Sequence, residues 1–434
     1  MKYELRRMRK LSPGLTVNNS GGAGKGSVIL MGEDAWNPAG SAGFPEELSP
    51  VAGKEGLGAF CFFSPFDDRT FPGNGYITRN VCDDAALFFH VTMNTNQSLN
   101  SRGSHIAWVD FLRILACFLV VLAHCCDPFV GSFDGSFNFK SAVFWGSLVR
   151  PCVPLFAMIS GVLLFPVTLE MGAFYSRRLK RVLVPLIVWS LALPLLYFGY
   201  FAAGVQTSSP NIVMDTYTWS ATVGKLYTFF FNFNYDTTPL WYVYMLVGLY
   251  LFMPIMSAWL TQARRKDVKI FLGIWIFSMT LPYIQMLAPA LGYEGNYGNM
   301  GILGVCDWNP YGMFYNFSGF LGYMVLAHYL TKYPLAWSWK KTLSITIPFF
   351  LIGFAVTFFG FLETQKHFPG QYSKLEVLWY FSGINVFLMT FAIFAVVSRL
   401  RIKAGPVLSK VAALTFGVYL CHFFFVQCSY DFVN

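Results

Sequence analysis

The sequence has little charge for its length. Of its 434 residues, 12% are Asp, Glu, Lys or Arg, whereas about 25% is usual in soluble globular proteins. Apolar residues make up 55% of the chain and aromatic residues 19%, so too few polar side chains are present to cover a soluble surface. This composition excludes a string of soluble domains and predicts an all-α, polytopic helical membrane protein.

The sequence also lacks the cysteine patterns of metal and redox sites. Its nine cysteines form no CxxC motif and show no Cys/His spacing suited to zinc, so no metal site is predicted. Most of them lie inside apolar runs, where a free cysteine behaves as a small hydrophobic residue. Cys125 and Cys126 are adjacent, but we expect no functional disulfide between them.

Residues 1–104 differ from the rest of the chain. They are rich in Gly, Ser, Pro and Asn and lack both an apolar segment of spanning length and a signal-peptide core. A glycine run over 21–26 resembles a phosphate loop, yet Lys25 is followed by Gly26 rather than Ser or Thr. We therefore expect a poorly ordered polar extension. A second hypothesis is that translation starts at Met93, directly before the first apolar segment, so that residues 1–92 are not translated.

Residues 105–434 contain the membrane-embedded domain. A spanning helix needs about 20 mostly apolar residues, and nine segments satisfy this. They are 108–126, 142–165, 182–204, 240–260, 270–290, 310–330, 343–362, 377–398 and 409–429. The stretch Leu226–Tyr235 is apolar but short and interrupted by Asn, so it is a re-entrant or interfacial piece or a weak tenth span. The sequence thus predicts nine to ten transmembrane helices around a polar central cavity.

The loops between these segments indicate their orientation. Loops after the second, fourth, sixth and eighth segments carry 15 Lys and Arg residues, whereas the alternate loops carry four. The positive-inside rule places the N-terminus in the cytoplasm and the C-terminus outside. Because the basic residues stand between apolar runs, the net charge of +9 reflects topology, and no nucleic-acid partner is expected.

The first apolar segment contains three ionisable residues, Asp110, Arg113 and His124. Such residues are costly inside a bilayer, at about 2.5–3.5 kcal/mol for Arg or Asp at a helix centre, so each is a candidate functional residue. Asp110 and Arg113 are one turn apart and can pair. His124 follows Arg113 by eleven residues, about 16 Å along a helix. The alternatives are a snorkelling anchor for Arg113 and an inert interfacial imidazole for His124.

Arginines elsewhere add to this set. Arg150 lies in the second segment among Pro151, Pro154 and the pair Ser160-Gly161, and broken backbone of this kind is tolerated where it lines a cavity. Its guanidinium requires an anion, a carbonyl oxygen, or a structural partner such as Asp127 or Asp134. Arg178 and Arg181 share a helical face, so both can bind one polyanion, although such a cluster is also a plain topology signal.

In this order the motifs resemble the acyltransferase-3 family of bacterial inner-membrane O-acyltransferases, over about residues 105–430. The motifs are Asp110-x-x-Arg113 followed by ten intervening residues and His124, the segment Val153 to Gly161, Arg178-x-x-Arg181, the segment Leu240-Trp241-Tyr242 to Pro254, and Phe416-Gly417-Val-Tyr419-Leu-Cys-His422. Many members have a histidine before the Leu-Trp pair, where this chain has Pro239.

The resemblance implies transfer of an acyl group, commonly acetyl, from cytoplasmic acyl-CoA to a hydroxyl of a cell-surface polysaccharide or a lipid-linked glycan precursor. Acyl-CoA is then a donor substrate, not a permanently bound cofactor. His124 is expected to act as general base or to accept the acyl group itself, and Arg150 to stabilise the oxyanion. Arg113, Arg178 and Arg181 are expected to bind acyl-CoA. The residues expected to line the substrate cavity are Asp110, Ser160, Trp241, Tyr242 and His422.

Two other functions are compatible with ionisable residues inside the membrane. A secondary transporter or exporter of a small polar solute uses such residues in its pathway, but many transporters show paired halves, and this sequence has no internal repeat. A passive membrane anchor would not need arginines in its first two segments. The enzyme is therefore the favoured prediction.

Overall fold

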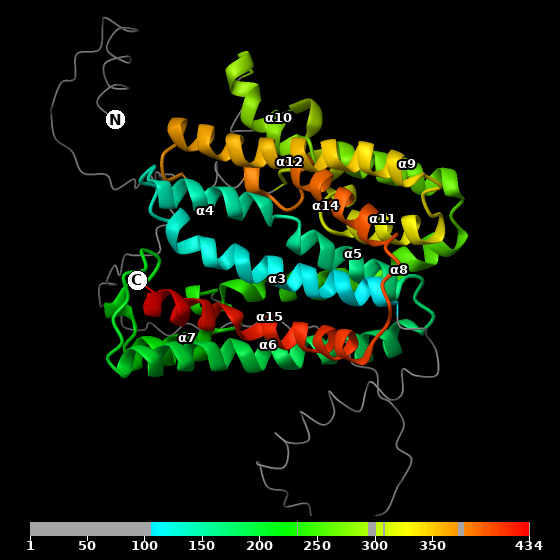
Figure 1. Cartoon of the computed structure of the whole chain (residues 1–434). Coiled ribbons are helices and arrows are strands. Elements are labelled where there is room, and N and C mark those ends of the chain that lie inside the picture. The colour runs from blue at the N-terminus through cyan, green and yellow to red at the C-terminus, as the bar shows by residue number, and fades with distance from the viewer. Residues whose placement is uncertain (1–105, 232, 294–300, 307–308, 372–376, 434) are drawn as a thin grey trace, which may run out of the picture. The chain divides into compact units, whose positions relative to one another are not determined.

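The computed structural model describes residues 106–434, apart from 232, 294–300, 307–308, 372–376 and 434. The extension predicted over 1–104 and the start-site hypothesis at Met93 lie outside the described residues. Every regular element that the structure describes is a helix (Figure 1), which confirms the predicted fold class.

Eight helical segments in the described part of the chain are long and apolar enough to cross a membrane. They are α3 (Ala107–Val130), α4 with α5 (Phe137–Leu148, Cys152–Leu164), α6 (Met171–Ala202), η2 with α8 (Tyr235–Leu240, Trp241–Gln262), α9 with α10 and η3 (Arg265–Ser278, Leu281–Leu287, Ala288–Leu291), α12 (Trp339–His367), Val377–Val397 with α14 (Ile384–Val397), and α15 (Pro406–Val433). The protein is therefore a multi-pass helical membrane protein.

The segment expected as the sixth span, 310–330, is not one long helix. It is divided between the short 3-10 helix η5 (Gly312–Phe317) and the twelve-residue helix α11 (Leu321–Lys332). Gly312 and Gly319 have φ values of 47° and 79°, a left-handed conformation that ends a regular helix and favours glycine. The predicted count of nine to ten long helices is thus not reached in the described residues.

The apolar stretch Leu226–Tyr235 does not form a span either. Its first residues belong to the ten-residue helix α7 (Trp219–Thr228), which begins where the Thr218 hydroxyl accepts a hydrogen bond from the Ala221 N–H at 3.2 Å. A ten-residue helix is about 15 Å long, half of what a bilayer needs. The alternative prediction of a weak tenth span at Leu226–Tyr235 is therefore wrong.

The segment expected as the second span is interrupted near its middle. Helix α4 begins at Ser136, whose hydroxyl accepts the Phe139 N–H at 3.1 Å, and it ends at Leu148. Pro151 has no N–H to donate and disfavours helical backbone at the residue before it. Arg150 consequently lies at the junction between α4 and α5 rather than inside a continuous helix.

Helix α3 packs against α15, α4 and α5, and Figure 1 shows it between α4 and α15. On α5, Gly161 allows a close approach to α11, because a Cβ atom there would lie 2.3 Å from the Met324 carbonyl oxygen. Only glycine fits such a contact. The glycine of the Ser160-Gly161 pair thus has a packing role.

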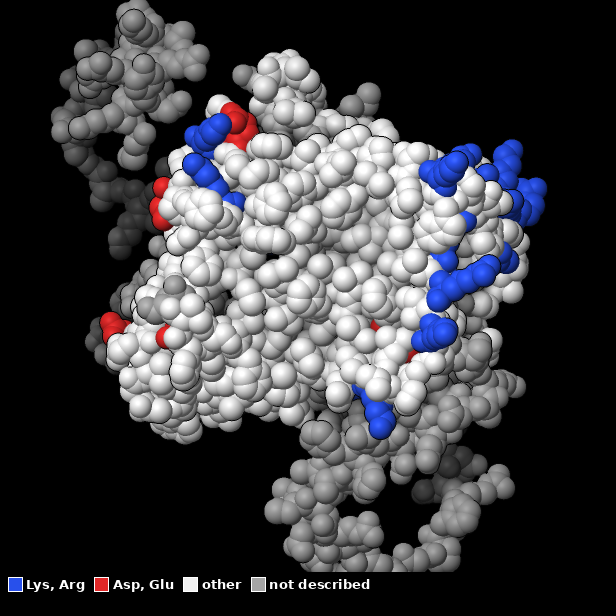
Figure 2. All heavy atoms as spheres, in the orientation of Figure 1, with Lys and Arg blue, Asp and Glu red and all other residues white. Residues whose placement is uncertain are grey.

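Basic side chains gather at one end of these helices (Figure 2). It is the end at which α6, α12 and α15 begin and α8 ends, and we call it the basic end. The Lys and Arg residues at those helix ends and the adjoining loops are Arg177, Arg178, Lys180, Arg181, Arg264, Arg265, Lys266, Lys332, Lys340, Lys341, Arg399, Arg401, Lys403 and Lys410. Helix α3 starts at the basic end, with Arg113 near its start and His124 toward its opposite end.

The contact at Gly161 generates a prediction about stability. Gly161→Ala forces the Met324 backbone to move, and overpacking of this kind costs about 1–3 kcal/mol, so we expect a lower melting temperature in detergent. Gly199→Ala on α6 is the matched control, because no atom lies within 4 Å of its Cβ position and alanine is the better helix former. Equal melting temperatures for the two variants would contradict the packing role.

Candidate functional site

His124 faces the neighbouring helix α15 from its place on α3. Its ring centroid lies 5.1 Å from that of His422 and 5.2 Å from that of Phe423. Its Nδ1 lies 2.6 Å from Oδ2 of Asp127, one turn further along α3, and the His124 side chain is 18% exposed. The imidazole therefore has a carboxylate on one side and a second imidazole close by.

His422 is buried, with 4% of its surface exposed. Its Nδ1 lies 2.7 Å from the carbonyl oxygen of Tyr419, and because a carbonyl only accepts hydrogen bonds, Nδ1 carries a hydrogen. Its Nε2 is buried and has no hydrogen-bond partner among the described residues. Since buried polar atoms are almost always paired, this lone pair is a candidate contact for a substrate hydroxyl.

At the basic end, three arginines lie near Tyr250 of α8. Tyr250 is a residue that the sequence did not single out. The Tyr250 hydroxyl lies within electrostatic range of Arg113, Arg178 and Arg181. The Nε of Arg178 is buried and has no hydrogen-bond partner among the described residues. Guanidinium groups gathered in this way suit phosphate oxygens, which they bind through charge-assisted hydrogen bonds.

The predicted pair between Asp110 and Arg113 is confirmed, with 3.4 Å between Oδ1 and Nη1. Asp110 is buried, and its second oxygen accepts a hydrogen bond from the Ser409 hydroxyl at 3.4 Å. Asp110 thus links α3 to the start of α15 and pairs with one of the three arginines near Tyr250, Arg113, Arg178 and Arg181, which we call the arginine cluster.

A row of buried tyrosines lies between the arginine cluster and the histidines. The Ser160 hydroxyl, which donates to the Phe156 carbonyl oxygen at 3.0 Å, lies near the hydroxyls of Tyr250 and Tyr242. The ring of Tyr242 lies 5.7 Å from that of Tyr419, which in turn lies 5.7 Å from that of His422. We call Tyr250, Tyr242 and Tyr419 the tyrosine row.

These side chains occupy the region where the sequence predicts an open polar cavity. All three members of the tyrosine row are buried, and the Phe156 ring packs beside both Tyr242 and Tyr419, 5.9 and 6.2 Å from their ring centroids. The two ends of α3 are therefore joined by packed side chains with hydroxyl groups, and the central cavity is not confirmed.

Arg150, at the junction of α4 and α5, lies beside the half of α3 that carries His124. Both Arg150 and Asp127 of α3 are within electrostatic range of the Cys126 and Cys152 thiols. Its Nε donates to the Gly146 carbonyl at 3.1 Å. Its guanidinium carbon lies 3.9 Å from the ring centroid of Trp379, a cation–π contact.

Trp241, expected near the substrate, belongs to the aromatic group around Arg150. Its ring stacks on Phe381 at 5.5 Å, and the guanidinium carbon of Arg150 lies 5.5 Å from the Phe381 ring. The aromatic faces therefore hold Arg150 and Trp241 together.

Asp134, one suggested partner of Arg150, instead accepts the Ser136 N–H at 2.9 Å. This hydrogen bond lowers the pKa of the Asp134 carboxyl.

A buried ion pair stands at the end of the helices opposite the basic end. Lys225 Nζ lies 2.6 Å from Oδ2 of Asp236, which is fully buried, and the Tyr217 hydroxyl donates to Oδ1 of Asp236 at 2.7 Å. Burial, and then the Asp236 charge, raise the pKa of Tyr217. The pair ties α7 to η2, which leads directly into Trp241 and Tyr242. In the sequence Lys225 is only one of the four basic residues of the alternate loops, and nothing there indicates its pairing with Asp236.

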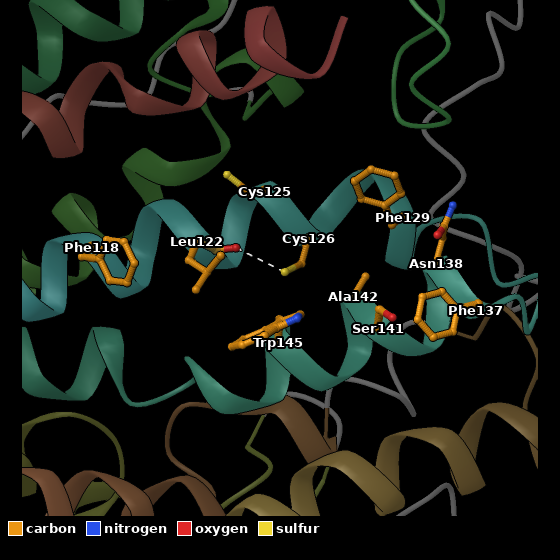
Figure 3. A pocket seen from close by; sticks show the side chains of 10 residues that line it. All are labelled: Phe118, Leu122, Cys125, Cys126, Phe129, Phe137, Asn138, Ser141, Ala142 and Trp145. Carbon is orange, nitrogen blue, oxygen red and sulfur yellow. Dashed lines mark hydrogen bonds between the residues drawn. The ribbon is translucent and has the colours of Figure 1, made fainter. Parts of the chain in front are cut away.

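Two surface pockets lie away from these groups. One, of about 530 Å³, is formed between α3 and α4. Figure 3 shows that it is lined by aromatic and other apolar side chains, with Cys125 and Cys126 at its α3 side; both thiols are free. The other, of about 420 Å³, lies between α8 and α9. Neither is lined by His124 or by the arginine cluster.

Comparison with known proteins gives one match. The family model described as an acyltransferase domain matches residues 106–434. No curated protein and no solved structure matches the chain.

The ion pair between Lys225 and Asp236 generates a prediction. Lys225→Met leaves a buried carboxylate without its cation, and breaking a buried pair costs about 3–5 kcal/mol, so the melting temperature should fall clearly. Lys366→Met is the matched control, because Lys366 and its partner Glu363 are 68% and 58% exposed and exposed pairs contribute little. If both variants melt alike, the ion pair does not hold α7 against η2.

Proposed function

The chain belongs to the acyltransferase-3 family, a family of membrane acyltransferases, and on that premise we propose its reaction. It moves an acyl group, acetyl in the first instance, from acyl-CoA at the basic end to a hydroxyl at the opposite end. The acceptor is a cell-surface polysaccharide or a lipid-linked glycan precursor. The observation that supports this proposal is the series of neighbouring side chains from the three arginines near Tyr250, through Tyr242 and Tyr419, to His422 and His124.

In this proposal the basic end faces the cytoplasm of a bacterial cell, and the protein lies in the inner membrane, as the distribution of Lys and Arg favours. Acyl-CoA carries phosphate groups at one end of a flexible arm. Arg113, Arg178 and Arg181 bind the phosphates. The Nε of Arg178 is buried and has no hydrogen-bond partner among the described residues, so a phosphate oxygen would satisfy this donor. The Tyr250 hydroxyl adds a further hydrogen bond.

The flexible arm then follows α3 past Ser160 toward His124. The tyrosine row and Phe156 are packed together in the structure, so their side chains must rotate to admit the arm. We take the packed arrangement as the resting state, in which the two sides of the membrane stay separated. Binding of the donor phosphates at Tyr250 supplies the interaction that opens the row.

At the opposite end Nε2 of His124 takes the proton of the acceptor hydroxyl, and the oxygen attacks the thioester carbonyl. Arg150 lies on the side where the oxyanion forms. When the intermediate collapses, the C–S bond breaks, the proton passes to the CoA sulfur, and an ester and free CoA remain. In a route through an acyl-histidine, the same Nε2 attacks the thioester first. The free Nε2 of His422 accepts a hydrogen bond from the acceptor, and Trp241 borders it.

The role of His124 is tested by acyl-CoA turnover. Full-length protein in lipid nanodiscs is given acetyl-CoA with a set of surface glycans, and release of the CoA thiol is measured. His124→Ala should reduce glycan-dependent release by about 10²–10⁴-fold, because the general base is lost, with insertion unchanged. His328→Ala, on α11 against Phe165, is the matched control and should stay active.

Two results would contradict this function. One is full turnover by His124→Ala. The other is uptake of a polar solute into vesicles without release of CoA, which would identify the protein as a transporter.

Donor binding is tested separately at the basic end. Arg178→Ala and Arg181→Ala each remove a charge-assisted hydrogen bond worth about 1.5–3 kcal/mol, so each should weaken CoA binding by about 10- to 100-fold in titration calorimetry. Arg264→Ala is the control, because Arg264 is exposed at the same end and already pairs with Asp267 at 2.9 Å. Equal CoA affinities for all three variants would place the donor site elsewhere.

A further inference from the structure

Asp127 and His124 form the one described carboxylate–imidazole contact on α3. The Nδ1 of His124 and Oδ2 of Asp127 are 2.6 Å apart, a distance typical of a charge-assisted hydrogen bond. An ionised carboxylate only accepts hydrogen bonds, so Nδ1 must carry the hydrogen. In the neutral ring Nε2 is then the unprotonated nitrogen, which is the one able to act as a base.

The residues around His124 favour the same assignment of hydrogens. His422, on α15, uses its own N–H to bind the Tyr419 carbonyl, so the neutral ring has no hydrogen to donate to Nε2 of His124. Phe423 packs edge-on against the His124 ring and offers no donor. The base nitrogen of His124 thus stays available for a substrate.

Other ionisable groups surround the pair from the neighbouring elements. Tyr235 of η2 lies within electrostatic range of Asp127. Arg150, at the junction of α4 and α5, is within range of the Cys126 and Cys152 thiols, as Asp127 also is. Asp127, His124 and Arg150 therefore belong to one group of ionisable side chains at this end of α3.

We propose that Asp127 is a positioning residue for the acyl transfer. This rests on the proposed function. Asp127 holds the His124 ring in one orientation and one tautomer, and it stabilises the imidazolium that forms when the acceptor hydroxyl gives its proton to Nε2. The hydrogen on Nδ1 stays in the bond to Asp127 throughout. The proton on Nε2 leaves with the CoA sulfur, so the unit returns to its starting state.

If Asp127 served only to stabilise the fold through its pair with His124, its removal would affect stability rather than the rate of the chemical step. The Asp127 side chain is 34% exposed and pairs within one helix, and such pairs contribute little to folding. Removing the charge should therefore leave the fold intact, while a positioning role makes the chemical step slow.

The test uses Asp127→Asn in the full-length protein in nanodiscs, with acetyl-CoA and the glycan set. Asparagine keeps the size of the side chain but can impose the wrong tautomer on His124, as in the serine-protease triad, where the same change lowers kcat by about 10⁴-fold. Because Asp127 is partly exposed, we expect kcat to fall by about 10- to 100-fold. KM for acetyl-CoA should change by less than about twofold, and the melting temperature should not change.

Two further variants separate positioning from charge and from folding. Asp134→Asn removes the same charge at the same end, where the carboxylate binds only the local Ser136 turn, and should keep full activity. Asp127→Glu retains a carboxylate and should restore part of kcat.

The outcomes are distinct. If His124→Ala is inactive while Asp127→Asn matches Asp134→Asn, positioning by Asp127 is overturned and the acyltransferase function stands. If Asp127→Asn and Asp127→Glu both lower the melting temperature and abolish activity alike, the residue is structural and the proposal fails. Full activity of His124→Ala would overturn both the proposal and the function.

Discussion

A charged side chain inside a membrane is stable only where the protein supplies its partners, and the site depends on this constraint. Arg113 has Asp110 and lies near Tyr250, Arg150 has the Gly146 carbonyl and the face of Trp379, and His124 has Asp127. Each partner also sets the direction of the group it satisfies. The arginines near Tyr250 thus present positive charge at the basic end, and Asp127 holds His124 through Nδ1 near the opposite end.

Close helix packing brings these two ends into one series of contacts. Gly161 lets α5 lie against α11, and the adjacent Ser160 lies near both Tyr242 and Tyr250. The Tyr419 hydroxyl donates to the carbonyl oxygen of Pro239.

Much of this arrangement could be predicted from the sequence. Apolar length predicted nine spans, of which eight are long helices in the described residues. The Lys and Arg pattern predicted the basic end, and helical spacing predicted the Asp110–Arg113 pair. The division of 310–330 was missed because composition alone does not reveal that Gly312 and Gly319 adopt left-handed backbone. Tyr250 follows Tyr242 by two helical turns on one buried face, a signal that was present but is hidden among many aromatics. The bond from Asp127 to His124 was missed because spacing equally allows Asp127 to pair with Arg150.

The central claim is that donor and acceptor meet His124 from opposite sides of the membrane. It is tested most directly in sealed proteoliposomes of uniform orientation, with acetyl-CoA supplied only at the basic end and the glycan acceptor only at the opposite end. The account predicts acetylated glycan on the acceptor side and free CoA on the donor side, both absent with His124→Ala. Product that forms only when donor and acceptor are on the same side of the membrane would contradict it.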